Sequence, residues 1–308
     1  MASTSIAAAQ GVTELRDERS REARVGLAFI AVPMALFLTL QIFAIGYAIF
    51  ISFWDWGIRG PREFVGLGNY TDLLGDGVFI GKAIPNTLLY TAIVVPSQMA
   101  LGLALAVIVN QKIRGQTFFR AAFYFPAIAS SAAIVVLFTF LTQPRGLINT
   151  LLGFVGIQTD INWTNDPATA LPSIMVLAIW TTSGTMMLFY LAALQSISRE
   201  VYEAAALDGA NWWSAFWSIT FPLLKPAHFF VAVISVIGAL QMFDQSFIAG
   251  GADGAPANSL TTMVLFLFRA TAKTFEYGYA AAVGVVLLVF IMTLTLIQRR
   301  LFGDAPAQ

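Results

Sequence analysis

Six segments of this chain are long and apolar enough to cross the hydrocarbon core of a lipid bilayer, and no other feature limits the possible folds as strongly. Only 11% of the residues are charged, against about 25% in an ordinary soluble domain. A backbone in lipid must satisfy its own hydrogen bonds, so each segment is expected to be helical. We therefore predict an all-α polytopic membrane protein with six transmembrane helices. The predicted spans are about 26–53, 83–109, 121–141, 172–194, 227–248 and 277–297.

A seventh apolar run, from Leu260 to Phe268, is too short to span the bilayer. It is expected to be either a lateral or re-entrant element or a surface helix at the interface, and the sequence leaves both alternatives open. Pro33, Pro96 and Pro126 interrupt the first three spans. Such breaks are tolerated where neighbouring helices or water satisfy the freed carbonyl groups, so they are compatible with a transport path without establishing one.

The distribution of basic residues predicts the orientation in the membrane. With the N-terminus inside, the cytoplasmic side carries eleven Lys and Arg residues and the outer side carries six, as the positive-inside rule requires. The cytoplasmic group is Arg16, Arg19, Arg21, Arg24, Lys112, Arg114, Arg120, Arg199, Lys225, Arg299 and Arg300. Six spans then leave both termini in the cytoplasm. The predicted domains are an N-terminal tail at 1–24, a transmembrane domain at 25–300 with a long inner loop at 196–226, and a C-terminal tail at 301–308.

Composition argues against several kinds of chemistry. The formal net charge is zero, which gives no indication of a nucleic-acid partner. The chain has no cysteine and a single histidine, His228, so neither a thiolate site nor a histidine cluster for a metal is expected. No GxxxxGK[ST] phosphate-binding loop is present. We expect no cofactor, no metal and no enzymatic activity in this chain.

The inner loop at 196–226 has the pattern of two short helices joined by a turn. Strong helix formers run from Arg199 to Leu207 after a possible N-cap at Ser198. Asp208-Gly209 is a turn signal, and residues 211–219 form a second, aromatic-rich helical segment. Pro222 and Pro226 are expected to break the chain before the fifth span. Spacing alone does not decide whether this loop caps the helix bundle or docks a cytoplasmic partner.

The loop also carries a longer pattern. It reads Glu203-Ala204-Ala205, Asp208-Gly209-Ala210, Phe216, Ile219, Pro222 and Pro226. This pattern resembles the EAA loop of binding-protein-dependent ABC importer permeases. Two further motifs, Phe64-Val65-Gly66-Leu67-Gly68-Asn69-Tyr70 and Phe275 with Tyr277-Gly278-Tyr279-Ala280, resemble the carbohydrate-uptake branch of that family. The chain departs from the family after the fifth span, where residues 249–256 stand in place of a TGGGP-like run.

The resemblance implies a permease subunit of an ATP-driven importer for a sugar or oligosaccharide in the bacterial cytoplasmic membrane. It implies a second permease subunit, often a different chain, two cytoplasmic ATPase subunits and an extracytoplasmic solute-binding protein. Glu203 would contact the ATPase, and Gly209 would form the tight turn. The implied coupling residues are Glu203, Ala204, Ala205, Asp208, Gly209, Ala210, Ile219 and Pro222. The alternatives are a secondary transporter without an ATPase partner, or a membrane-embedded enzyme, for which the sequence offers few ionisable groups.

Polar residues within spans suggest where a solute is held, because such groups are costly in lipid. Gln241, Asp244 and Gln245 have i, i+3, i+4 spacing, which would place them on one face of the fifth span. Amides and a carboxylate suit sugar hydroxyls, but Asp244 could equally reach the outer interface or bond a neighbouring helix. Thr181, Thr182 and Ser183 in the fourth span are weaker candidates, since hydroxyls often bond their own helix.

Overall fold

The computed structural model describes residues 21–111 and 115–302. The chain divides into two compact units, residues 1–51 and 52–308, which we describe separately. The described part of the first unit is one apolar helix, Arg21–Ile51. It contains the π-helical turn η1 (Leu38–Phe43) and α2 (Ala44–Ile51), and it continues through Pro33 without a break. Residues 1–20 and 303–308 of the predicted tails, together with Lys112 and Arg114, lie outside the described residues.

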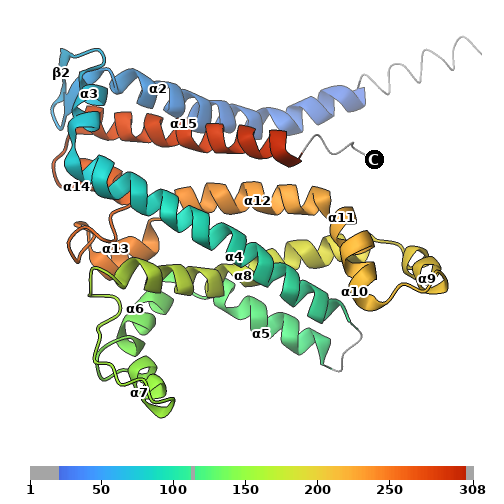
Figure 1. Ribbon diagram of the computed structural model, residues 1–308. Coiled ribbons are helices and arrows are strands. Elements are labelled where there is room, and N and C mark those ends of the chain that lie inside the picture. Colours follow the sequence, from blue (N-terminus) through green and yellow to red (C-terminus); the bar gives the residue numbers. More distant parts are fainter. Residues whose placement is uncertain (1–20, 112–114, 303–308) are drawn as a thin grey trace, which may run out of the picture. The chain divides into compact units, whose positions relative to one another are not determined.

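The second unit contains four apolar segments that are each long enough to cross a membrane, at Phe79–Asn110, Ala170–Ser196, Lys225–Gly250 and Tyr277–Arg300. Their main helices are α4 (Ile84–Asn110), which follows the π turn η2 (Phe79–Ala83), α8 (Ala170–Ser196), α12 (Lys225–Leu240) and α15 (Tyr277–Phe302). α4 packs along α8, and α12 contacts α4, α8 and α15 (Figure 1). The prediction of an all-α, multi-span membrane protein is confirmed.

The third predicted span, 121–141, is not a single straight helix but a bent pair of helices that is apolar enough to form one span. It consists of α5 (Gln116–Ile128) and α6 (Ser131–Leu141), which meet at an angle of 92°. Pro126 lies near the end of α5, and Ala129 is extended, with φ −69° and ψ 153°. α6 packs against α13 (Asp244–Gly250) instead of continuing the direction of α5. Both halves are apolar, so their pattern does not reveal the change of direction.

The short apolar run is a buried helix. α14 (Met263–Ala272) packs against α15 and η2. The Thr262 hydroxyl caps it by accepting from the Leu265 amide at 3.2 Å, and the Thr87 hydroxyl of α4 accepts from the Met263 amide at 2.9 Å. Met263 and Leu265 are fully buried. The alternative of a surface helix is therefore wrong.

A small hairpin is the one sheet in the described residues. β1 (Trp54–Gly57) pairs antiparallel with β2 (Gly60–Phe64), and α3 (Gly68–Gly75) follows. The Asn69 side-chain amide donates to the carbonyls of Ser52 and Trp54 at 2.8 and 3.0 Å. Gly278, at the start of α15, lies so close to the Trp54 carbonyl that any side chain there would clash. The two motifs that resemble the carbohydrate-uptake branch therefore meet in one packing unit.

Candidate functional site

The first half of the inner loop is a helix that ends in a Schellman motif. α9 (Arg199–Leu207) is followed by Gly209 with φ +80°. The Gly209 amide donates to the Ala206 carbonyl at 3.1 Å, and the Ala210 amide donates to the Ala205 carbonyl at 2.9 Å. This pair of bonds requires a left-handed residue at the Gly209 position, which glycine adopts without strain. The predicted turn at Gly209 is confirmed.

The second half of the loop is more continuous than the prolines suggest. Asn211 caps α10 (Trp212–Ala215) by accepting from the Ser214 amide at 2.8 Å. The helix then widens into the π turn η3 (Phe216–Thr220) and continues as α11 (Phe221–Leu223). Pro222 lies in the first turn of α11, so the expected break before the fifth span falls after it, between Pro222 and Pro226. A turn at Leu224 then leads into α12.

The two halves are fixed to each other by a hydrogen bond between the Tyr202 and Thr220 hydroxyls, at 3.0 Å. Ser198 occupies the N-cap position, but its side chain makes no capping bond.

Among the predicted coupling residues, Ala205 is buried and Ala210 and Ile219 are half-buried, whereas the others are exposed. The exposed members are Glu203, Ala204, Asp208, Gly209 and Pro222.

Leu207, the last residue of α9, is a candidate that its sequence position does not indicate. Its side chain is 91% exposed and lies directly before the Asp208-Gly209 turn. Full burial of a leucine side chain contributes about 1.5–3 kcal/mol of stabilising free energy, and Leu207 lacks this contribution. Leu207 lies between a run of helix formers and a turn signal, and this place in the sequence does not show that its side chain is exposed.

The fifth predicted span bends before the residues proposed for the solute path. α12 ends at Leu240, and α13 begins at Asp244. Gln241 and Asp244 are exposed, and Gln245 is half-buried. The prediction that these three share one face of a continuous helix is wrong. The Thr262 hydroxyl donates to the Met242 carbonyl at 2.9 Å and so satisfies a backbone group that the break leaves free.

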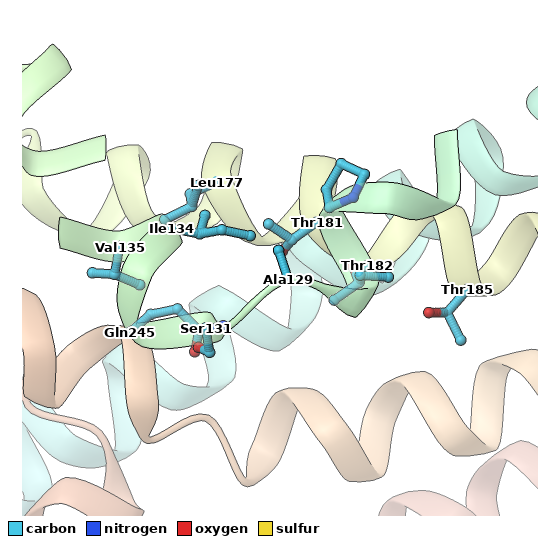
Figure 2. Close-up of a pocket in the computed structure, with 11 residues that line it drawn as sticks. Ala129, Ser131, Ile134, Val135, Leu177, Thr181, Thr182, Thr185 and Gln245 are labelled. Carbon is cyan, nitrogen blue, oxygen red and sulfur yellow. The ribbon is translucent and has the colours of Figure 1, made fainter. Parts of the chain in front are cut away.

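A cavity of about 190 Å³ lies at the bend between α5 and α6, with α8 and α13 forming its other walls. Its polar lining residues are Ser131, Thr181, Thr182, Thr185 and Gln245. Figure 2 shows Gln245 and Ser131 toward one end of this lining and Thr185 toward the other. Among the described residues, no charged side chain lines the cavity.

Three of these polar groups are available to a ligand. Ser131, Thr185 and Gln245 make no side-chain hydrogen bond with the described part of the chain. Thr181 donates to the Ala178 carbonyl at 3.1 Å, and Thr182 contacts both Ala178 and the Gln98 amide oxygen. The cavity therefore brings together three of the sequence candidates, Thr181, Thr182 and Gln245. Ser183 is buried and bonds the Ile179 carbonyl instead.

Other polar groups have structural roles. His228 is buried, and its Nδ1 lies 3.0 Å from the Tyr190 hydroxyl. No cluster of three or more potential metal ligands occurs in residues 21–111 and 115–302. The Lys273 ammonium, directly after α14, lies 2.7 Å from both carboxylate oxygens of Asp253 in the loop after α13, and it holds the pKa of Asp253 below its usual range.

The chain is similar to membrane components of known transport systems. Residues 98–303 match the family described as "Binding-protein-dependent transport system inner membrane component". The lactose transport system permease protein LacF of Rhizobium radiobacter is 34% identical over 276 residues, which cover 89% of this chain and 92% of LacF. The multiple sugar-binding transport system permease protein MsmF of Streptococcus mutans is 35% identical over 279 residues, covering 90% and 94%.

A solved structure shares the fold. A chain of a bacterial ABC transporter involved in import of the acidic polysaccharide alginate aligns with a TM-score of 0.79. The alignment covers 96% of this chain and 100% of that one, at 21% sequence identity.

Proposed function

The chain belongs to the family of inner membrane components of binding-protein-dependent transport systems, which are ABC importer permeases, and from this premise we propose how it couples ATP hydrolysis to the import of an uncharged sugar. The observation that carries the proposal is the exposed tip of the inner loop. There a Schellman turn holds the exposed Leu207 and Asp208 at the end of α9.

The tip has the properties of a docking element. Leu207 supplies apolar area, and Glu203 and Asp208 supply charge for the rim of a contact. The Tyr202–Thr220 bond joins α9 to η3, and the helical path then leads through α11 into α12. A movement of the tip would therefore be transmitted to the spanning helix α12 through the Tyr202–Thr220 hydrogen bond and the helical segments that follow it. ATP hydrolysis is assigned to two separate cytoplasmic subunits, because the chain has no phosphate-binding loop.

The cavity at the α5–α6 bend is proposed as this chain's part of the solute path. Hydroxyl and amide groups match sugar hydroxyls, and the absence of a charged lining residue among those described favours an uncharged solute. Its volume of about 190 Å³ is below the roughly 300–1,000 Å³ of a ligand pocket. A second permease subunit would complete the site. The names of the lactose and multiple-sugar relatives support a glycoside, delivered by an extracytoplasmic binding protein.

A secondary transporter is less well supported. Such proteins usually carry coupling carboxylates or basic groups within their spans. No Asp, Glu, Lys or Arg side chain is buried among the described residues.

Purification of the tagged chain from its native membrane tests the proposal. We expect a P-loop ATPase and a second permease to co-purify, and ATPase activity to rise when solute-loaded binding protein is added. Solute accumulation by the chain alone in vesicles, driven by an ion gradient, would support the secondary transporter instead.

The orientation gives a first prediction. We propose that Ser198 lies in the cytoplasm and Gln158, in the loop after α7 (Leu147–Phe154), lies outside. Reporter fusions at these two positions should report opposite sides of the membrane. The same side for both would show that α8, the helix between the two positions, does not cross the membrane, and would contradict the proposed orientation.

The solute path gives a second prediction. Gln245→Ala should reduce solute uptake by roughly 5- to 150-fold, because the loss of one hydrogen-bonding partner costs about 1–3 kcal/mol. Gln241 and Asp244 remain proposed path residues, but neither lines the cavity. Gln241→Ala is therefore the matched control and should have the smaller effect. Transport rates at equal membrane levels of the subunit provide the comparison, and a Gln245→Ala rate equal to that of the unsubstituted protein would remove Gln245 from the site.

Asp244→Ala tests the remaining polar residue of this segment. Weaker uptake in a fully assembled complex would place Asp244 on the path, whereas unchanged uptake would leave it as an interfacial residue at the first turn of α13.

A further inference from the structure

A second and larger hollow lies away from the solute cavity. It is a groove of about 1070 Å³ between one face of α4 and the aromatic side chains of the segment at 212–221. On the α4 side the wall is formed by small and apolar residues, among them Met99, Ala100 and Ala104. Trp212 and Trp213, on the opposite side, are each 60% exposed.

The groove has the length of one membrane leaflet. On the α4 side its residues extend from Pro96 to Gln111, which directly follows the helix, a separation of 15 positions. This corresponds to about 22 Å along a helix, against roughly 15 Å for half of the hydrocarbon core. The groove can therefore hold a lipid chain and extend into the headgroup region, where tryptophan side chains are favoured.

The charge in the groove comes from one residue. Lys225 is the single charged residue among the described residues that line it, and it lies at the start of α12. It forms no ion pair with any carboxylate in the described ranges. An exposed, unpaired ammonium beside an apolar channel is complementary to an anionic lipid headgroup.

A second polar group lies one helical turn deeper. His228 is three residues after Lys225, about 4.5 Å further along the helix. Its Nε2 is buried and makes no hydrogen bond of normal geometry, although the Phe221 carbonyl is near enough to interact with the ring. Because this Nε2 atom is buried, His228 forms part of the groove wall and is not a donor to a ligand in the groove.

We propose that this groove binds one anionic glycerophospholipid of the cytoplasmic leaflet. Lys225 contacts the phosphate, and an acyl chain lies along the small residues of α4. The ammonium of Lys225 matches the phosphate of such a lipid, and the apolar wall of the groove matches its acyl chain. The assignment to the cytoplasmic leaflet rests on the proposed function, which places the 212–221 segment at the cytoplasmic surface.

The test uses the assembled importer in phosphatidylcholine nanodiscs that contain a diazirine-tagged phosphatidylglycerol. After irradiation, labelled peptides are located by mass spectrometry. We expect labels in residues 96–111 and 212–228. Ala104→Trp fills the groove from an exposed position and should reduce this labelling at least fivefold. Ala92→Trp, at an exposed site of α4 outside the groove, should leave it unchanged.

Lys225→Gln tests the headgroup contact separately. The preference for phosphatidylglycerol over a diazirine-tagged phosphatidylcholine should fall about fivefold, as expected for the loss of one cation near the membrane surface. Arg300→Gln, an exposed cation of α15, is the control. Equal labelling of wild type and Ala104→Trp, or cross-links from Ala104 to a helix of the partner permease, would overturn the proposal. Labelling needs no transport, so its outcome is independent of the uptake and ATPase measurements that test the proposed function.

Discussion

Replacing Gly209 with valine should reduce solute uptake roughly tenfold or more while leaving the subunit inserted in the membrane. Gly209 has φ +80° and closes the Schellman motif after α9. A β-branched residue resists this conformation, at a cost of about 1–3 kcal/mol. No neighbouring atom lies within 4 Å of a Cβ built at this position, so the effect would come from backbone strain and not from a clash. The turn would open and displace Leu207 and Asp208.

The matched control is Gly209→Asn. Asparagine adopts the left-handed conformation more readily than other non-glycine residues, so this variant should retain most of the uptake. The measurements are initial uptake rates and the amount of ATPase subunit that co-purifies, both at equal membrane levels of the permease. Normal uptake by Gly209→Val would show that the turn geometry does not contribute to coupling.

The turn could be predicted from sequence because its cause is local. Gly209 follows a run of helix formers, and a glycine just after such a run favours a left-handed cap. The spans were predictable for a similar reason, since hydrophobic length alone identifies them. The helix Arg21–Ile51 and helices α4, α8 and α15 lie close to the predicted ranges.

The breaks in the third and fifth spans have causes that lie elsewhere in the chain. α6 changes direction where it packs on α13, and the interruption after Leu240 is stabilised by a hydrogen bond from Thr262, 20 residues away. The hydrophobic pattern of the sequence shows that the helices on both sides of a break are apolar. It does not show the angle at which these two helices meet. The same limit explains why Ser131 and Thr185 were missed, because only the bend brings them beside Gln245.

The docking tip provides the last and most direct test of the ATPase contact. Leu207→Ser should weaken association of the permease with its ATPase by roughly 10- to 150-fold, because burial of a leucine contributes about 1.5–3 kcal/mol. The side chain is 91% exposed, so the change should not affect folding of the subunit. The measurement is the dissociation constant between the detergent-solubilised permease pair and the purified ATPase.

Leu74→Ser makes the same chemical change at a leucine that is 72% exposed in α3, outside the inner loop. This control should bind the ATPase normally. A Leu207 variant with unchanged affinity would show that the apolar tip contacts something other than the ATPase. If both variants bind more weakly, the loss reflects general destabilisation, and the assignment of Leu207 to the interface fails. A loss confined to Leu207 would identify burial of this one side chain as a main source of the docking free energy, with Glu203 and Asp208 at the rim of the contact.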